Sequence, residues 1–151
     1  MKKLFSGVAE ISVSYKPYIS DKPIVMSALD AYNVFFDFFP LETIGLQEIF
    51  LVMYLNNASR VLGVYKVSTG GITGTIVDLK LILSVGLKIV ASGIMLAHNH
   101  PSGSLKPSHQ DILVTNKIKD AAKVLDIKLL DHLIVSPEKG SYISLANEGM
   151  L

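Results

Sequence analysis

The feature that most restricts the fold is an almost uninterrupted apolar run at residues 48–55. It reads Glu-Ile-Phe-Leu-Val-Met-Tyr-Leu, so only its first residue carries a charge. A run of this length is typical of a β-strand that is buried on both faces, because a half-exposed strand would alternate polar and apolar residues. Residues 92–97 form a second, shorter apolar run and predict another buried strand. Two such strands require a sheet that is covered by further layers of structure.

The rest of the chain predicts a mixture of strands and helices around these two runs. Ser27 can cap a helix that Pro40 ends, and a polar–apolar alternation with β-branched residues favours a strand at residues 8–15. The expected strands cover residues 8–15, 48–55, 60–68, 92–97, 127–135 and 141–145, and the expected helices cover residues 28–39, 77–90 and 108–125. We therefore expect the α/β class, with a mixed β-sheet flanked by helices in a layered sandwich.

Composition narrows the possible functions. The chain has 151 residues, which favours a single domain, and 14 basic against 13 acidic residues give a net charge of +1. Proteins that depend on non-specific contact with phosphates usually carry a strong basic excess, so this balance argues against such a role. The absence of cysteine excludes disulfides and thiolate metal sites. No apolar window reaches the length of a membrane helix, and the first residues are not a convincing signal peptide, so we expect a cytoplasmic protein without membrane contact.

A glycine-rich segment at residues 69–74 has two possible functions. Its sequence, Thr-Gly-Gly-Ile-Thr-Gly, lacks both the Gly-Lys-Ser/Thr ending of a P-loop and the spacing of a dinucleotide-binding motif. A tight connection, or a loop beside a ligand cleft, is therefore favoured over a phosphate-binding loop.

Histidines cluster where the second apolar run ends. Three of the four histidines lie within residues 98–109, and His98 and His100 are spaced so that both side chains project to the same side of a strand. Asp111 lies on the first turn of the following helix. Two histidines and one carboxylate are the ligand number of a catalytic zinc site, which keeps one position for water. We interpret the cluster as a divalent metal site, although histidines also often end strands as polar tips.

Ser108 and Asp111 also have a simpler interpretation. Their spacing fits a capping box, in which both side chains only satisfy the backbone at the start of a helix. Taken alone, this interpretation would be favoured. The combination with His98 and His100 changes the balance, because His98-x-His100, seven residues, Ser108, two residues and Asp111 match the JAMM motif of the JAB1/MPN metalloprotease superfamily without a gap.

A longer stretch resembles the RadC family of this superfamily. Residues 96–103 read Leu-Ala-His-Asn-His-Pro-Ser-Gly, and residues 130–135 read Leu-Asp-His-Leu-Ile-Val. The resemblance covers residues 9–151 and implies the JAB1/MPN fold, which is cytidine-deaminase-like. It also implies one RadC-like domain over residues 1–151, without the helix-hairpin-helix segment of many RadC proteins. Residues 78–80 read Asp-Leu-Lys where RadC proteins often have His-Pro-Arg, so the resemblance does not extend to a substrate contact made by this triplet, whereas the metal site is unaffected.

The resemblance also implies an activity and its residues. It implies a zinc ion, Zn2+, held by His98, His100 and Asp111, and hydrolysis of an amide in a peptide or isopeptide substrate. Glu48 matches the position of the family's catalytic glutamate, and Ser108 would assist the oxyanion. Without the resemblance, a solvated strand start would be slightly favoured for Glu48, and Glu42 is a second candidate for the base.

Two other functions stay open at this stage. Relatives named for DNA repair raise the alternative of a nucleic-acid-associated module, against which the charge balance argues. A non-catalytic MPN scaffold is the other alternative, but such scaffolds usually lose motif residues. Outside the motif, we expect His109 to be exposed, and we expect His132 to be a core histidine rather than a supporting partner of the site.

Overall fold

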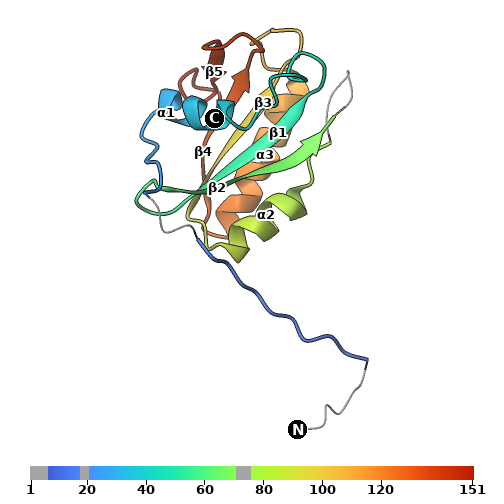
Figure 1. The fold of residues 1–151 in the computed structure, drawn as a ribbon, viewed down its shortest axis with the longest axis vertical. Helices are drawn as coiled ribbons and strands as arrows, with labels where there is room; N and C mark the ends of the chain where they lie inside the picture. Colours follow the sequence, from blue (N-terminus) through green and yellow to red (C-terminus); the bar gives the residue numbers. More distant parts are fainter. Residues whose placement is uncertain (1–6, 18–20, 71–75) are drawn as a thin grey trace.

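A computed structural model describes residues 7–17, 21–70 and 76–151 (Figure 1). These residues contain three helices and five strands in the order α1, β1, β2, α2, β3, α3, β4, β5. Their bounds are α1 Ala28–Phe36, β1 Ile49–Leu55, β2 Val61–Thr69, α2 Leu79–Lys88, β3 Gly93–Asn99, α3 His109–Val124, β4 Lys128–Val135 and β5 Tyr142–Ser144. The expected α/β class, with a mixed sheet and flanking helices, is confirmed.

The strands form one mixed sheet in the order β2-β1-β3-β4-β5. Strand β1 is antiparallel to both β2 and β3, whereas β3 and β4 are parallel. Both apolar runs of the sequence therefore lie in the middle of the sheet, and every residue of β1 and of β3 is buried. Because β3 and β4 are parallel, their carboxyl ends meet at the same edge as the amino end of β1.

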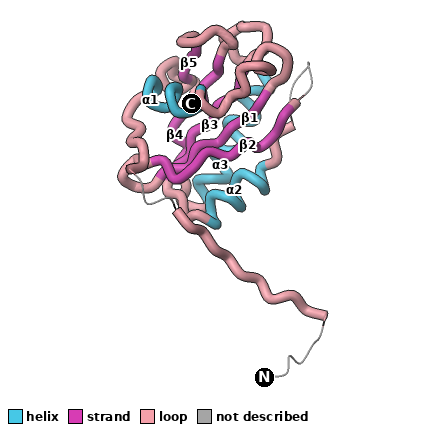
Figure 2. Tube along the Cα trace, viewed as in Figure 1, coloured by secondary structure: helices cyan, strands magenta, loops and turns pink. Residues whose placement is uncertain are grey.

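Helices cover both faces of this sheet (Figure 2). On one face, Ala31 and Phe35 of α1 pack with Leu51 and Met53 of β1. On the other face, residues of α2 and α3 pack on the alternate strand residues, which are Phe50, Val52, Tyr54, Ile94 and Leu96. Alternation along each strand thus sends neighbouring side chains into two separate cores.

The prediction of a strand at residues 8–15 is wrong. The described structure has no strand there, and the segment extends away from the sheet with Ile11 and Val13 exposed by 88% and 69% (Figure 1). The Tyr15 hydroxyl at the end of this segment donates a hydrogen bond of 3.1 Å to the Leu62 carbonyl. Alternating polar and apolar residues indicate a preference for extended backbone, but a strand also needs the edge of another strand to pair with.

The predictions for helix α1 and for the glycine-rich segment have different outcomes. Helix α1 starts as expected, with the Ser27 hydroxyl accepting a bond of 3.1 Å from the Asp30 amide, but it ends at Phe36 instead of residue 39. Phe39 is nevertheless buried, because the turn after the helix returns it to the core. Most of the glycine-rich segment lies outside the described residues, so neither of its two interpretations is tested.

No helix among the described residues is both long enough and apolar enough to cross a membrane.

Candidate metal centre

The candidate site forms where β3, β1 and α3 come together. His98 is near the end of β3, His100 follows that strand, and Asp111 lies in the first turn of α3. His98 belongs to the alternate residues of β3 that face α3, and His100, two residues later, returns to the same side. The turn at residues 101–107 then reverses the chain, which brings Asp111 to both histidines.

The three side chains converge on one point. The Nε2 atoms of His98 and His100 are 3.0 Å apart, and they lie 3.2 Å and 3.3 Å from the two carboxylate oxygens of Asp111. Among the described residues, these three side chains form the group that could hold a metal ion, because their ligand atoms all lie within 4.8 Å of one another. The structure thus brings together the three ligands predicted from sequence.

Asp111 also takes part in the capping box of α3, whose N-cap residue is Ser108. Its Oδ2 accepts a bond of 2.7 Å from the Ser108 backbone amide, while the Ser108 hydroxyl accepts a bond of 3.0 Å from the Asp111 amide. The capping box and the histidine cluster therefore use the same carboxylate, and the two interpretations of the sequence do not compete. The cap fixes Oδ2, which leaves Oδ1 as the less constrained ligand atom.

A chain of buried hydrogen bonds sets the proton positions on His98. The Thr115 hydroxyl has one proton, and it donates that proton to the Asp111 carbonyl at 2.6 Å. Its oxygen must therefore accept from His132 Nδ1, also at 2.6 Å. Burial lowers the pKa of His132 well below its ordinary value, so the ring is neutral and its Nε2 accepts. His98 Nδ1 is then the donor across the 2.7 Å contact, so a neutral His98 ring has its lone pair on Nε2.

His100 is oriented in the same way by the backbone. Its Nδ1 lies 2.7 Å from the Ser104 carbonyl, which can only accept, so Nδ1 carries a proton and the neutral ring has its lone pair on Nε2. Gly103 makes this turn possible, because its φ of +83° lies in the left-handed region that favours glycine. Both histidines consequently direct Nε2 lone pairs toward the same point.

Two facing lone pairs only 3.0 Å apart repel each other unless a positive charge lies between them. The charges of the neighbouring groups also favour a cation at this point. Burial raises the pKa of Asp111, but the bonds to His100 and His98 outweigh it and lower the pKa well below the ordinary range. The bond to Asp111 raises the pKa of His100, although burial opposes it. The cluster therefore attracts a cation, either a proton or a metal ion.

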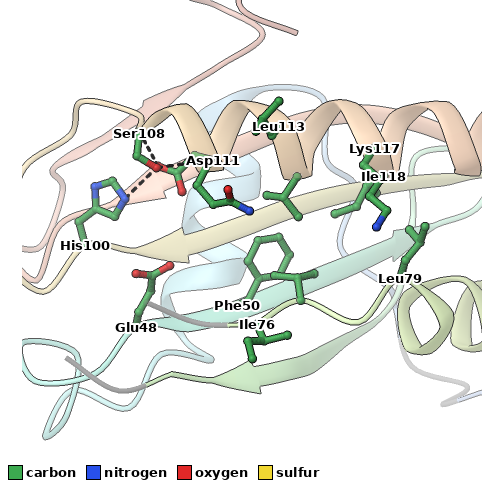
Figure 3. Close-up of a pocket in the computed structure, with 13 residues that line it drawn as sticks. Glu48, Phe50, Ile76, Leu79, His100, Ser108, Asp111, Leu113, Lys117 and Ile118 are labelled. Atoms are coloured by element: carbon green, nitrogen blue, oxygen red, sulfur yellow. Dashed lines mark hydrogen bonds and ion pairs between the residues drawn. The ribbon is translucent and has the colours of Figure 1, made fainter. Parts of the chain in front are cut away.

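Glu48 lies beside this cluster because of the strand register. Strand β1 pairs with β3 so that Phe50 is opposite His98. Two residues further along the same antiparallel register, Glu48 comes opposite His100, and Figure 3 shows its carboxylate directed toward the cluster. Burial raises the pKa of Glu48, while His98 and His100 oppose this shift. A carboxylate with a raised pKa is suited to accept and return a proton near neutral pH.

Asn99 holds the backbone that carries Glu48, and sequence reasoning did not identify it. Its side chain is buried and points to the opposite face from the two histidines. The amide donates to the carbonyls of Ile44 and Gln47 at 2.7 Å and 2.8 Å, and its oxygen accepts from the Ile49 amide at 2.7 Å. These bonds tie the segment before β1 to the strand that carries the histidines.

Replacing Asn99 with alanine is expected to lower the free energy of unfolding by about 3 kcal/mol or more. The change removes the partner of three backbone groups, and the two on the buried residues Ile44 and Ile49 each cost about 1–3 kcal/mol when left unpaired. Urea unfolding followed by circular dichroism measures this loss. The control is Asn33→Ala on the exposed side of α1, for which we expect a change within about 0.5 kcal/mol. Equal stability of the Asn99 variant and the wild type would contradict this role.

Several other residues are placed outside the cluster. His109 is exposed, as expected, and Glu42 is exposed on the turn before β1. His132 is buried, as expected of a core histidine, and its Nε2 also lies 2.7 Å from His98 Nδ1, so it combines the two roles considered for it. Asp78 caps α2 by accepting from the Lys80 amide at 2.8 Å, which gives the unusual triplet at residues 78–80 a structural role.

Comparison with known proteins is consistent with this geometry. The family model described as "RadC-like JAB domain" matches residues 25–150. A UPF0758 protein of Flavobacterium johnsoniae is 48% identical over 103 residues, which cover 68% of this chain and 44% of that protein. A UPF0758 protein of Porphyromonas gingivalis is 35% identical over 149 residues, which cover 99% of this chain and 65% of that protein. The chain thus matches less than two thirds of either relative's length.

Proposed function

Because the chain belongs to the family of RadC-like JAB domains, we propose that it is a zinc-dependent hydrolase that cleaves an amide bond in a peptide or isopeptide. One observation carries the proposal. The Nε2 atoms of His98 and His100 face each other at 3.0 Å, beside a carboxylate that is held at 3.2 Å and 3.3 Å. Internal hydrogen bonds fix both ring orientations, so the cluster is arranged to receive a cation.

The donor set fits zinc. Two imidazole nitrogens and one carboxylate oxygen are common zinc ligands, and three protein ligands are typical of a catalytic site rather than a structural one. His100 and Asp111 also line a cleft, so the point between them is accessible to a substrate (Figure 3). A zinc ion bound there would activate a water molecule and polarise the amide carbonyl.

The chain's own residues then supply the proton transfers. Glu48 accepts a proton from the attacking water and gives it to the leaving amine. The water oxygen becomes bonded to the carbonyl carbon, the C–N bond breaks, and the products are a carboxylic acid and an amine. The Ser108 hydroxyl accepts from the Asp111 amide, so its own proton is available to donate to the oxyanion. All motif residues of a catalytic domain are present, which favours this proposal over a non-catalytic scaffold.

His132 is expected to strengthen zinc binding through His98. Its replacement by alanine removes the acceptor for His98 Nδ1, and we expect zinc affinity to fall by about 10–100-fold. His132→Gln should restore part of this loss, because an amide can both accept from His98 and donate to Thr115. Competition with a chelator of known affinity measures the change, and thermal unfolding verifies that each variant is folded. The exposed His109→Ala serves as the control, and unchanged affinity in His132→Ala would contradict the role.

Hydrolysis is tested with a mixed peptide library in water enriched in 18O. The zinc-loaded protein is incubated with the library, and mass spectrometry identifies new carboxyl termini that contain one 18O atom. The proposal predicts such termini with the wild type and their loss with Glu48→Gln. Identical peptide profiles for the two proteins, in the presence of bound zinc, would contradict hydrolysis of peptide amides.

A further inference from the structure

A cleft of about 490 Å³ extends from the proposed zinc site along helix α3. Glu48, His100, Ser108 and Asp111 line one end of it, and Lys117 lines the other end (Figure 3). This volume lies within the range of sites that bind small molecules and short peptides. The cleft is therefore large enough for several residues of a substrate beyond the bond that is hydrolysed.

Its middle part is apolar on both sides. Helix α3 contributes Leu113 and Val114, while Phe50 of β1 and Leu79 of α2 form the opposite wall. Leu113 is 49% exposed and lies at the rim of this cleft. An exposed group of apolar side chains beside a reactive centre is typical of a surface that binds an apolar ligand group.

The far end of the cleft carries a positive charge. Lys117 follows Asp111 by six residues, which corresponds to about 9 Å along a helix. Within the described residues Lys117 has no ion pair, because those present join His98 and His100 to Asp111. A distance of about 9 Å equals between two and three residues of extended peptide. A carboxylate at that distance from the hydrolysed amide would lie next to Lys117.

We propose that the cleft binds the leaving-group side of a peptide that has a large apolar side chain next to the hydrolysed amide and a carboxylate two to three residues further on, at Lys117. This inference rests on the proposed zinc hydrolase. Glu48, which returns the proton to the leaving amine, lines the cleft, so the leaving group enters it. The carboxylate is either the carboxyl terminus of the peptide or an acidic side chain, since both present the same group to the lysine.

The test uses hydroxamates, which bind a catalytic zinc ion without being hydrolysed. The reference probe is a succinyl hydroxamate with an isobutyl side chain, followed by Ala-Ala with a free carboxyl terminus. A second probe has an amidated terminus, a third has hydrogen in place of isobutyl, and a fourth has Ala-Glu with an amidated terminus. Calorimetric titration of the zinc-loaded full chain gives the Kd of each probe.

We expect the reference probe to bind about tenfold or more tightly than the probe without isobutyl, because burial of a leucine-like side chain is favourable. We expect it to bind about three- to fivefold more tightly than the amidated probe, as for an exposed ion pair. Lys117→Met should abolish this second preference, whereas Lys119→Met, on the same helix but outside the cleft, should retain it. Leu113→Ser should reduce the isobutyl preference, and Val124→Ser should not.

Different failures have different meanings. If all probes bind equally well to zinc-loaded protein, the zinc site stands and the substrate inference is overturned. If the carboxylate preference survives in Lys117→Met, the role of that lysine is overturned. If no probe binds, the proposed zinc site fails together with the inference. Equal binding of the amidated Ala-Glu probe and the reference probe supports an acidic side chain as an alternative carboxylate, and weaker binding assigns the carboxyl terminus.

Discussion

Replacing Glu48 with glutamine is expected to lower kcat for amide hydrolysis by about 10²–10⁴-fold while zinc affinity stays unchanged. Glutamine has nearly the shape of glutamate but cannot accept a proton from the attacking water, and this is the size of effect that general-base catalysis contributes. The carboxylate takes no part in the His-His-Asp cluster, so removing its charge should not release the metal. Kinetics on a cleaved library peptide, together with zinc titration of each variant, measure both quantities.

Glu42→Gln is the matched control for this change. Glu42 lies six residues before Glu48 on the same approach to β1, but its side chain is exposed and outside the cleft. We expect its replacement to leave kcat within about twofold of the wild type, as for most surface changes. Full activity of Glu48→Gln, or a large loss in Glu42→Gln, would show that the base is assigned to the wrong residue.

Zinc is expected to stabilise the folded protein strongly, and Asp111→Asn should remove most of this effect. A ligand that binds only the folded state at a concentration of 100 Kd adds about 2.7 kcal/mol. For a domain of this size, such a gain corresponds to a rise in Tm of about 5–10 °C. Asparagine can still accept from the Ser108 amide and so retain the helix cap, but its neutral amide is a poor zinc ligand.

Asp120→Asn provides the comparison on the same helix. It removes one negative charge from an exposed position of α3, far along the helix from the cap. Scanning calorimetry with and without zinc should give the wild-type shift for this variant and little shift for Asp111→Asn. An equal shift in both variants would mean that zinc stabilises the protein from a site other than the cluster.

The middle of the sheet was predictable because β1 and β3 are apolar on both faces, a pattern that few other structures produce. The strand expected at residues 8–15 shows the limit of such patterns. Alternation describes the preference of a segment for extended backbone, whereas a strand also depends on a pairing edge that is distant in sequence. For the same reason, the end of α1 at Phe36 depends on the packing of the turn that follows, not on helix propensity alone.

The metal cluster was predictable because its ligands lie within fourteen positions of one another, on a strand end and the next helix. Glu48 was placed by resemblance, and only the register of β1 against β3 explains why it is opposite His100. His132 and Thr115 could not be assigned, because their contacts depend on how α3 packs on β4. The burial of Asn99 could have been predicted from the sequence, because alternation along a buried strand directs its side chain into the interior, on the face opposite to the histidines.

The most direct test is anomalous diffraction from crystals grown with zinc, measured on both sides of the zinc absorption edge. The proposed site predicts one strong peak about 2.0–2.2 Å from Nε2 of His98, Nε2 of His100 and a carboxylate oxygen of Asp111, with Glu48 outside the ligand shell. Zinc found only elsewhere on the protein, with His98 and Asp111 still in direct contact at 3.2 Å, would contradict it.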